Sequence, residues 1–445
     1  MASDSSMLRA GSTLPPGRTG GLSALWRIAA RDDQNRNTSY LTLNTVLGAA
    51  MGLAFWLFVT RWPAVTTADI GTGYAIIALG TLVGVVSKGG LDTALMRHVP
   101  GASRPHAAHM LRLSLAVGVG VAVVLVAGLG LAAHYVPVLP HLGVFNWVII
   151  ATMAALFIVT WLQDAYYMGL GSARPTLQRN IVVGVARVII IIPLVALTWL
   201  EPVAFTWLIA VAVSALAAST MGRTIARRPA RADDVRVADS TFLMSAARNV
   251  TSGAAELAPG LVLAPLVLAV AGPASAGYFA MAWAAASILF LAAVAISRSA
   301  LVELVRGDAI AQARVVRRGL WQELILLAPA AIFGMLLAPQ LLAVFGPDYA
   351  REAGTTLIIL FASTLLVGPG FLYLAVLRAR EETVALVALP LAMIAILVLL
   401  APPLLSMWGI RGVALAWLAA NVPMGLLAAW RLPWRLPKEG DAHVN

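Results

Sequence analysis

The sequence predicts an all-α polytopic membrane protein with about twelve transmembrane helices in two six-helix bundles. Three observations support this fold class. The 445-residue chain is 60% hydrophobic and only 11% charged, with a mean hydropathy of +0.87, whereas soluble domains carry about 25% charged residues. Long apolar stretches recur from Tyr40 to Trp430. Arg residues collect in alternate gaps between these stretches.

Each apolar stretch is long enough to cross a hydrocarbon core of about 30 Å at about 1.5 Å per helical residue. A backbone inside the bilayer must satisfy its own hydrogen bonds, which favours helices. We expect spans at 40–60, 72–92, 113–133, 146–169, 181–200, 203–221, 250–270, 275–297, 319–343, 353–377, 383–405 and 412–430.

The basic residues predict the orientation, because cytoplasmic loops of membrane proteins are enriched in Arg and Lys. The tail before the first span holds five Arg, the gap 222–249 holds six and the gap 298–318 holds five. The opposite gaps contain only Arg61, Arg351 and Arg411. Both termini are therefore predicted to be cytoplasmic, in a multi-pass protein of the inner (plasma) membrane.

The long gap in the middle of the chain predicts the domain organisation. It separates two groups of six spans, flanked by polar tails. The predicted units are a cytoplasmic tail with a candidate interfacial helix at 1–39, an N-terminal bundle at 40–221, a cytoplasmic linker at 222–249, a C-terminal bundle at 250–430 and a cytoplasmic tail at 431–445.

Two short matches indicate that the halves are repeats of one another. Gly73–Tyr74 recurs 204 residues later as Gly277–Tyr278, and Tyr167 recurs 206 residues later as Tyr373. Nearly equal offsets at two distant places favour duplication of a six-span unit. Such repeats are a transporter design, with the substrate site near the repeat interface.

Several classes of chemistry lack the residues that they need. The chain has no Cys, which excludes disulfides and thiolate-bound clusters. Its six His fall in predicted loops or a tail, and no phosphate-binding GxxxxGK[ST] pattern occurs. The net charge of +11 is explained by cytoplasmic loops rather than by nucleic acid. We expect no catalytic residue, no metal, no cofactor and no nucleic-acid partner.

Four segments resemble polysaccharide flippases. FGPDYA from Phe345 follows the ninth span, and YLAVLRAREE from Tyr373 joins the tenth and eleventh spans. GIRGVALAW from Gly409 begins the last span, and GLDTALMRHVPG from Gly90 ends the second. With twelve spans, the chain resembles the multidrug/oligosaccharidyl-lipid/polysaccharide (MOP) superfamily, and most closely its bacterial polysaccharide-flippase branch.

The resemblance implies a mechanism and a cargo. It implies a V-shaped pair of bundles that alternates between inward-open and outward-open states. It also implies a lipid-linked oligosaccharide or polysaccharide precursor, moved from the cytoplasmic to the outer leaflet, with glycan polymerases as candidate partners.

Ionisable residues inside the spans are candidate site residues, because each is costly in the bilayer unless paired or hydrated. The candidates are Lys88 and Asp92 in the second span, Asp164 in the fourth, Arg187 in the fifth, Glu256 in the seventh and Arg248 at the mouth of the seventh.

The basic candidates suggest a cytoplasm-facing vestibule. Lys88, Arg187 and Arg248 would bind the pyrophosphate of a lipid carrier there, because guanidinium matches phosphate oxygens in bidentate geometry. Asp164 and Arg187 are predicted to share a depth in neighbouring antiparallel spans. They are interpreted either as a structural ion pair or as a pair that opens when substrate competes for its cation. Lys88 and Asp92 form a second candidate pair at i,i+4 spacing.

Acidic residues are the candidates for ion coupling. Glu256 precedes Pro259, Gly260 and Pro265, so its span is predicted to be kinked there. A carboxylate beside a broken helix is a candidate cation or proton site, and Asp164 is a second one.

Two other function classes compete with a flippase. A cation-coupled multidrug or metabolite antiporter of the same superfamily is the alternative, and it would be expected to show mainly acidic in-span residues. A membrane glycosyltransferase or ligase ranks below both, because the predicted outward loops are too short to hold such a site. The glycan, the carrier lipid, the coupling ion and the oligomeric state are not encoded in any recognisable pattern.

Overall fold

The computed structural model describes residues 33–136, 138–194, 201–225, 236–249, 257–305 and 309–432. All regular secondary structure in these ranges is helical. The first half contains α2 (Asp33–Thr60), α3 (Thr67–Lys88), α4 (Leu91–His98), a short 3₁₀ turn η1 (Val99–Gly101), α5 (Arg104–Ala132), α6 (Val144–Gly169), α7 (Arg174–Leu194) and α8 (Pro202–Ile225).

The second half follows a short linker helix, α9 (Asp239–Arg248). Its elements are α11 (Leu263–Leu304), α12 (Ala309–Gln322), a π-helical segment η2 (Glu323–Leu327), α13 (Ala328–Leu336), α14 (Ala338–Ala343), α15 (Pro347–Ala379), α16 (Thr383–Trp408) and α17 (Ile410–Arg431).

The helices confirm the predicted multi-span membrane fold. Within the described ranges, ten helices are long and apolar enough to cross a membrane. One of them, α11, is bent at Gly272, whose φ of 80° is left-handed. Glycine adopts this conformation without steric cost, and Pro273 cannot donate a helical hydrogen bond. The bend separates the predicted spans 250–270 and 275–297, and α2 provides the first predicted span.

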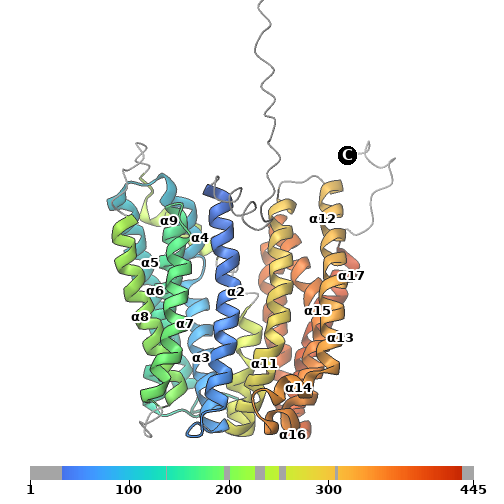
Figure 1. The fold of residues 1–445 in the computed structure, drawn as a ribbon. Helices are drawn as coiled ribbons and strands as arrows, with labels where there is room; N and C mark the ends of the chain where they lie inside the picture. The colour runs from blue at the N-terminus through green and yellow to red at the C-terminus, as the bar shows by residue number, and fades with distance from the viewer. Residues whose placement is uncertain are drawn as a thin grey trace, which may run out of the picture.

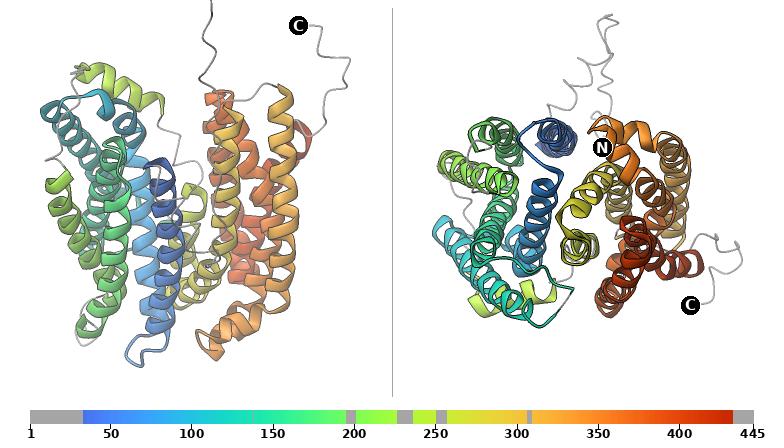
Figure 2. Two further views of the ribbon diagram at one scale, coloured as in Figure 1. Left: turned by 45° about the horizontal axis from the view of Figure 1, so that its top comes forward. Right: turned by 90° about the horizontal axis from the view of Figure 1, so that it is seen from below.

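Two groups of helices lie side by side, α2–α8 in one and α11–α17 in the other (Figures 1 and 2). We call the side where α2 begins and α17 ends the terminal face. The other side is the opposite face. The predicted interfacial helix near residues 22–29, and most of both predicted tails, lie outside the described residues.

The halves are joined where α3 crosses α11, near the opposite face. A Cβ on Gly71 would overlap the carbonyl oxygen of Pro273, and a Cβ on Gly277 would overlap that of Thr67. Only glycine permits backbones to approach so closely. The Arg61 guanidinium adds two hydrogen bonds to the Val344 carbonyl, at 2.9 and 2.7 Å. The opposite face is therefore closed.

The helix bounds extend the internal repeat. When residue numbers of the first half are increased by 206, the starts of α5, α6, α7 and α8 coincide with those of α12, α15, α16 and α17 within three residues. At this offset Gly71, rather than the predicted Gly73, corresponds to Gly277, and Thr67 corresponds to Pro273. The crossing of α3 and α11 is therefore itself pseudo-symmetric. The repeat provides a frame in which the two halves can be compared position by position.

The predicted linker contains a helix that the sequence interpretation missed. α9 packs on the first half, where the fully buried Phe242 lies edge-on to the His98 ring at 6.0 Å between centroids. The Asp239 carboxylate lies 3.0 Å from His109 Nε2, and the Val237 amide donates to His106 Nε2. Both of these His were predicted to lie in a loop, but they belong to the first turns of α5.

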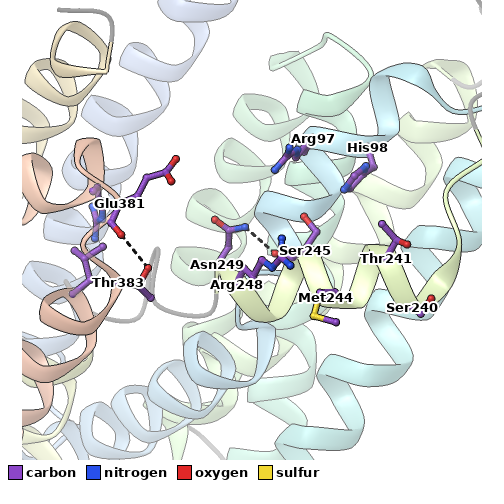
Figure 3. Close-up of a pocket in the computed structure, with 12 residues that line it drawn as sticks. Arg97, His98, Ser240, Thr241, Met244, Ser245, Arg248, Asn249, Glu381 and Thr383 are labelled. Carbon is purple, nitrogen blue, oxygen red and sulfur yellow. Dashed lines mark hydrogen bonds between the residues drawn. The ribbon is translucent and has the colours of Figure 1, made fainter. Parts of the chain in front are cut away.

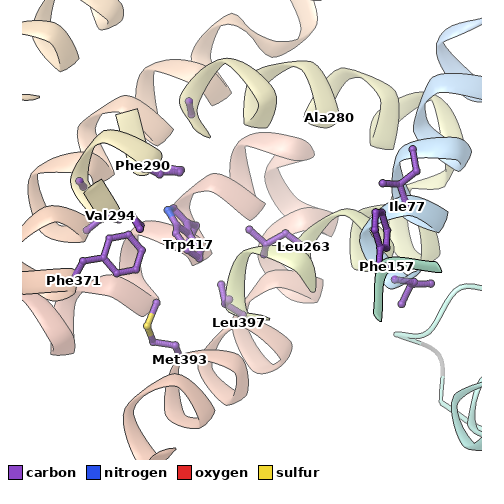
Figure 4. Close-up of a cluster of buried hydrophobic side chains, with 14 of the residues drawn as sticks. Ile77, Phe157, Leu263, Ala280, Phe290, Val294, Phe371, Met393, Leu397 and Trp417 are labelled. Atoms are coloured by element: carbon purple, nitrogen blue, oxygen red, sulfur yellow. The ribbon is translucent and has the colours of Figure 1, made fainter. Parts of the chain in front are cut away.

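Buried aromatic and aliphatic side chains pack together in the interior of the second half, and the cluster continues to Ile77 on α3 (Figure 4). Trp417 on α17 meets Trp283 edge-to-face at 5.0 Å between centroids. Its Nε1 donates to Ser363 Oγ at 3.1 Å. Buried Trp is favourable when its N–H finds an acceptor in this way.

Candidate functional site

A pocket of about 890 Å³ lies between the two halves at the terminal face. Its walls come from α4 and α9 on one side, and from the end of α15 and the start of α16 on the other (Figure 3). Most of the lining residues have polar side chains, and the charged ones are mainly basic. It includes Arg97, His98, Ser245, Arg248, Asn249, Arg378, Glu381 and Thr383.

Helix ends position the basic groups. Arg97 lies in the last turn of α4, Arg248 in the last turn of α9 and Arg378 in the last turn of α15. Cations are favourable at helix C-termini, where the partial charge is negative. Three such ends from both halves bring three guanidinium groups to one pocket.

Glu381 is the one acidic side chain among the described residues that line the pocket. It has a φ of 56° in the tight turn between α15 and α16. Non-glycine residues rarely adopt left-handed conformations, and such strain is often found at functional sites. With three Arg against one Glu, the pocket is suited to an anion.

His98 adds a titratable group to the same wall. Burial, and then the neighbouring Arg97, lower its pKa below the ordinary value of 6.5. The ring is therefore neutral near pH 7, and it gains a positive charge only under more acidic conditions.

Among the predicted substrate residues, Arg248 lines this pocket. Lys88 does not. Its ammonium group is paired with Asp92 one turn away, and it lies 6.0 Å from the centre of the Trp161 ring. The pair is the i,i+4 structural arrangement that was one of the two interpretations of these residues.

The predicted pairing of Asp164 with Arg187 is wrong. Asp164 is buried and accepts hydrogen bonds from Arg179 at 2.6 Å and from Thr176 at 3.0 Å. The error arose from the start of the fifth span, which was predicted at residue 181 whereas α7 begins at Arg174. Arg179 is therefore already inside the helix, five residues from its start, and matches the depth of Asp164 near the end of α6.

Arg187 lies deeper along α7, away from the predicted vestibule. Its guanidinium stacks on the Trp207 ring at 3.4 Å from the centroid. Trp207 is five residues from the start of α8, which is near the opposite face. Arg187 therefore does not join Arg248 in the pocket. Glu256, the predicted ion-coupling residue, lies outside the described residues.

Arg97, Arg378 and Glu381 were missed as candidates. They lie in two of the segments that carry the family resemblance, GLDTALMRHVPG and YLAVLRAREE. A search limited to charges inside spans could not select them, because they lie at helix ends. Within the described ranges, no group of three or more His, Asp or Glu side chains could hold a metal ion.

No protein-family model matches the sequence, and no curated protein matches it. Several solved structures, however, are similar to this chain. The chain is similar to a multidrug resistance MATE family transporter of the MOP superfamily in an inward-facing conformation, with a TM-score of 0.65 and 16% identity over 92% of this chain and 100% of that one. It is also similar to the lipid II flippase MurJ in an inward closed conformation, with a TM-score of 0.68 and 14% identity over 87% and 86%.

A third similar structure is a MOP superfamily transporter from Pyrococcus furiosus, described with a binding pocket of reverse polarity. Its TM-score is 0.61, with 15% identity over 91% of this chain and 96% of that one. At these identities the likeness establishes the fold alone. The predicted MOP-type fold is thereby confirmed, and the flippase branch stays a prediction.

Proposed function

We propose that this protein is a transporter that moves an anionic lipid-linked oligosaccharide or polysaccharide precursor from the cytoplasmic to the outer leaflet of the inner membrane. The observation that supports this most is the pocket shared by the two halves, whose described lining holds three Arg side chains (Arg97, Arg248 and Arg378) and one acid, Glu381. The MOP-type fold supports the transporter class, because its neighbours include MATE transporters and a lipid flippase.

The pocket chemistry fits a pyrophosphate joined to a sugar. Guanidinium groups bind phosphate oxygens in bidentate geometry and stay charged at all relevant pH values. Ser245, Asn249 and Thr383 add hydroxyl and amide groups suited to sugar hydroxyls. The volume of about 890 Å³ lies within the usual range for ligand pockets, about 300–1,000 Å³.

The arrangement of the two halves fits a conformation that takes up substrate at the terminal face. The halves are in contact near the opposite face through Gly71, Gly277 and Arg61, and the pocket lies at the terminal face. With the termini in the cytoplasm, as the Arg distribution predicts, this pocket would receive substrate from the cytoplasmic leaflet. If these contacts opened and the halves closed at the terminal face, the pocket would face the outer leaflet. A glycan polymerase is a candidate partner that would accept the released substrate there.

Binding of a defined probe tests the proposal. Purified protein is titrated with a short-chain polyprenyl-pyrophosphate disaccharide, and with the uncharged polyprenol as a blank. Each of Arg97→Ala, Arg248→Ala and Arg378→Ala should weaken binding about tenfold, since a hydrogen bond to a charged group contributes about 1.5–3 kcal/mol. Arg351→Ala, an exposed change near the opposite face, is the matched control. Equal affinity for the polyprenol would contradict the proposal.

The alternative is a cation-coupled multidrug or metabolite antiporter, which the MATE neighbours favour. It predicts uptake of a lipophilic cationic dye into proteoliposomes, driven by an ion gradient. The three Arg of the pocket should repel such a dye. Dye transport that Glu381→Gln abolishes, together with no translocation of the labelled pyrophosphate lipid, would replace the flippase with the antiporter.

A further inference from the structure

Glu323 is a buried carboxyl group that the proposed pocket does not use. Only 6% of its surface is exposed. Within the part of the chain that the structure describes, neither of its carboxylate oxygens has a hydrogen-bond partner. An ionised carboxylate buried without a partner is very costly, and such groups normally take up a proton instead.

The backbone around Glu323 is specialised. It begins the π-helical segment η2, which interrupts the otherwise regular helix between α12 and α13. The carboxyl group faces Gly368 on α15, where a Cβ would lie 3.0 Å from it. One turn away on the same helix, the buried Thr364 hydroxyl also lacks a partner among the described residues. Single π-turns inside α-helices are frequently found at functional sites.

The charged groups on neighbouring elements do not neutralise Glu323. Among the described elements, those that pack most closely against η2 are α11, α12, α13 and α15. α13 has no titratable side chain. The nearest titratable side chains along the other three are Arg298 and Glu303 on α11, Arg314, Arg317 and Arg318 on α12, and Tyr373 and Arg378 on α15.

Six of these seven groups lie at the surface or line the pocket, whereas Tyr373 is buried five residues beyond Gly368 on α15. The five on α11 and α12 are exposed, and Arg318 is engaged with Glu303 at 3.2 Å. Arg378 lines the pocket at the terminal face. Gly319 on α12 faces Leu372, and Glu323 in η2 faces Gly368, so the helix surface that meets η2 on α15 is apolar at these two positions.

The fold itself does not require an acid at this place. In the repeat frame Glu323 corresponds to Val117 and Gly368 to Leu162. The matching stretch of α5, residues 114–124, contains no ionisable side chain and remains α-helical. The first half therefore builds the same helix pair without a carboxyl group or a π-turn.

We propose that Glu323 is a proton-binding site that couples the transport cycle to the pH difference across the membrane. In the conformation seen here, closed at the opposite face, the carboxyl group holds a proton taken from water. The proton leaves when the second half rearranges and water reaches the group. Because the neutral form suits this conformation, low pH should favour it and high pH should favour the alternative. The coupling role rests on the proposed transport function, whereas protonation linked to conformation does not.

Spin labels on opposite walls of the pocket test this linkage without any substrate. The chain has no Cys, so Ser240→Cys on α9 and Thr383→Cys on α16 can be labelled selectively. In wild type the distance distribution between the labels should shift between pH 5.5 and pH 8.5. Glu323→Gln, which is permanently neutral, should show the low-pH distribution at both values. Glu303→Gln, an exposed acid on the neighbouring α11, should still shift like wild type.

A second variant controls for a folding defect in Glu323→Gln. Glu323→Met has similar length and places no polar atom in the apolar site, so it should fold and should also lose the shift. Infrared difference spectra between the two pH values should show loss of a protonated-carboxyl band in wild type, and this loss should be smaller in both Glu323 variants.

Three results would overturn the proton site. The first is a wild-type distance distribution that does not change with pH. The second is a pH-dependent shift that persists in Glu323→Gln or Glu323→Met, and the third is a shift produced by Na⁺ at constant pH. Failure of the polyprenyl-pyrophosphate binding experiment would leave these measurements unaffected, so the two proposals fail separately.

Discussion

Three charged side chains of the first half, Asp164, Lys88 and Arg187, have charged or aromatic partners, whereas Glu323 in the second half has no hydrogen-bond partner among the described residues. Asp164 pairs with Arg179, Lys88 with Asp92, and Arg187 lies against Trp207. In the repeat frame the positions of Asp164, Arg179 and Arg187 are Gly370, Ala385 and Met393. The second half thus forms the corresponding helices without these charges.

This difference shows that the common helical frame does not require any of the buried charges. A group that has partners within one half can act as a clamp, as Asp164 does between α6 and α7. A group without a partner has no such structural use and is free to change its protonation state. The contrast leads to four predictions.

The largest effect is expected at the clamp of the first half. Asp164→Ala leaves the Arg179 guanidinium buried and uncompensated, which should lower the free energy of unfolding by about 3–5 kcal/mol. Thermal unfolding of the detergent-purified protein measures this. The double variant Asp164→Leu with Arg179→Met should recover most of the loss. If the double variant were as unstable as the single one, the pair would not be the clamp.

The next effect is expected where the halves meet. Gly71→Ala and Gly277→Ala each place a Cβ against a backbone carbonyl, and overpacking costs about 1–3 kcal/mol. Because the two positions are equivalent in the repeat, the losses in unfolding temperature should be similar. Gly128→Ala, where nothing lies within 4 Å of the added carbon, is the control. A large loss at only one position would break the pseudo-symmetry of this crossing.

A smaller effect is expected for Arg187. Arg187→Ala removes a cation–π contact with Trp207, an interaction that contributes about 0.5–2 kcal/mol. Stability should fall modestly, while affinity for the polyprenyl-pyrophosphate probe stays unchanged, because Arg187 is not part of the pocket lining. A loss of probe affinity in a stable Arg187→Ala protein would restore the vestibule that the sequence predicted.

The smallest effect concerns His98 and pH. Its pKa is lowered in the folded protein, so the folded state disfavours the charged ring. The corresponding stability is fully present above the ordinary pKa of 6.5 and is lost as pH falls below it. Between pH 7.5 and 5.5, wild type should therefore lose more thermal stability than His98→Asn. Identical pH profiles would show that the α4–α9 contact is insensitive to this ring.

The multi-span helical fold could be predicted from the sequence alone, and two short sequence matches already indicated the duplication that the helix bounds extend. The bilayer requires long apolar segments whose backbones satisfy their own hydrogen bonds, and this requirement acts along one dimension of the chain. The same constraint made Asp164 and Arg187 visible as unusual residues within apolar surroundings. The same criterion left the polar first turns of α7, and with them Arg179, outside the predicted span, because a span was predicted only where the apolar residues begin.

Beyond one helical turn, which charges pair with one another could not be predicted from the sequence. The pocket is built from the ends of α4, α9 and α15, whose Arg residues lie outside apolar spans and are distant in sequence. Among the described residues, Glu323 lacks a charged neighbour partly because it packs against Gly368, 45 residues later along the chain. The Arg side chains of the preceding α12 are exposed. Hydropathy places a residue in the membrane, but the packing of helices from separate parts of the chain decides whether its charge has a partner.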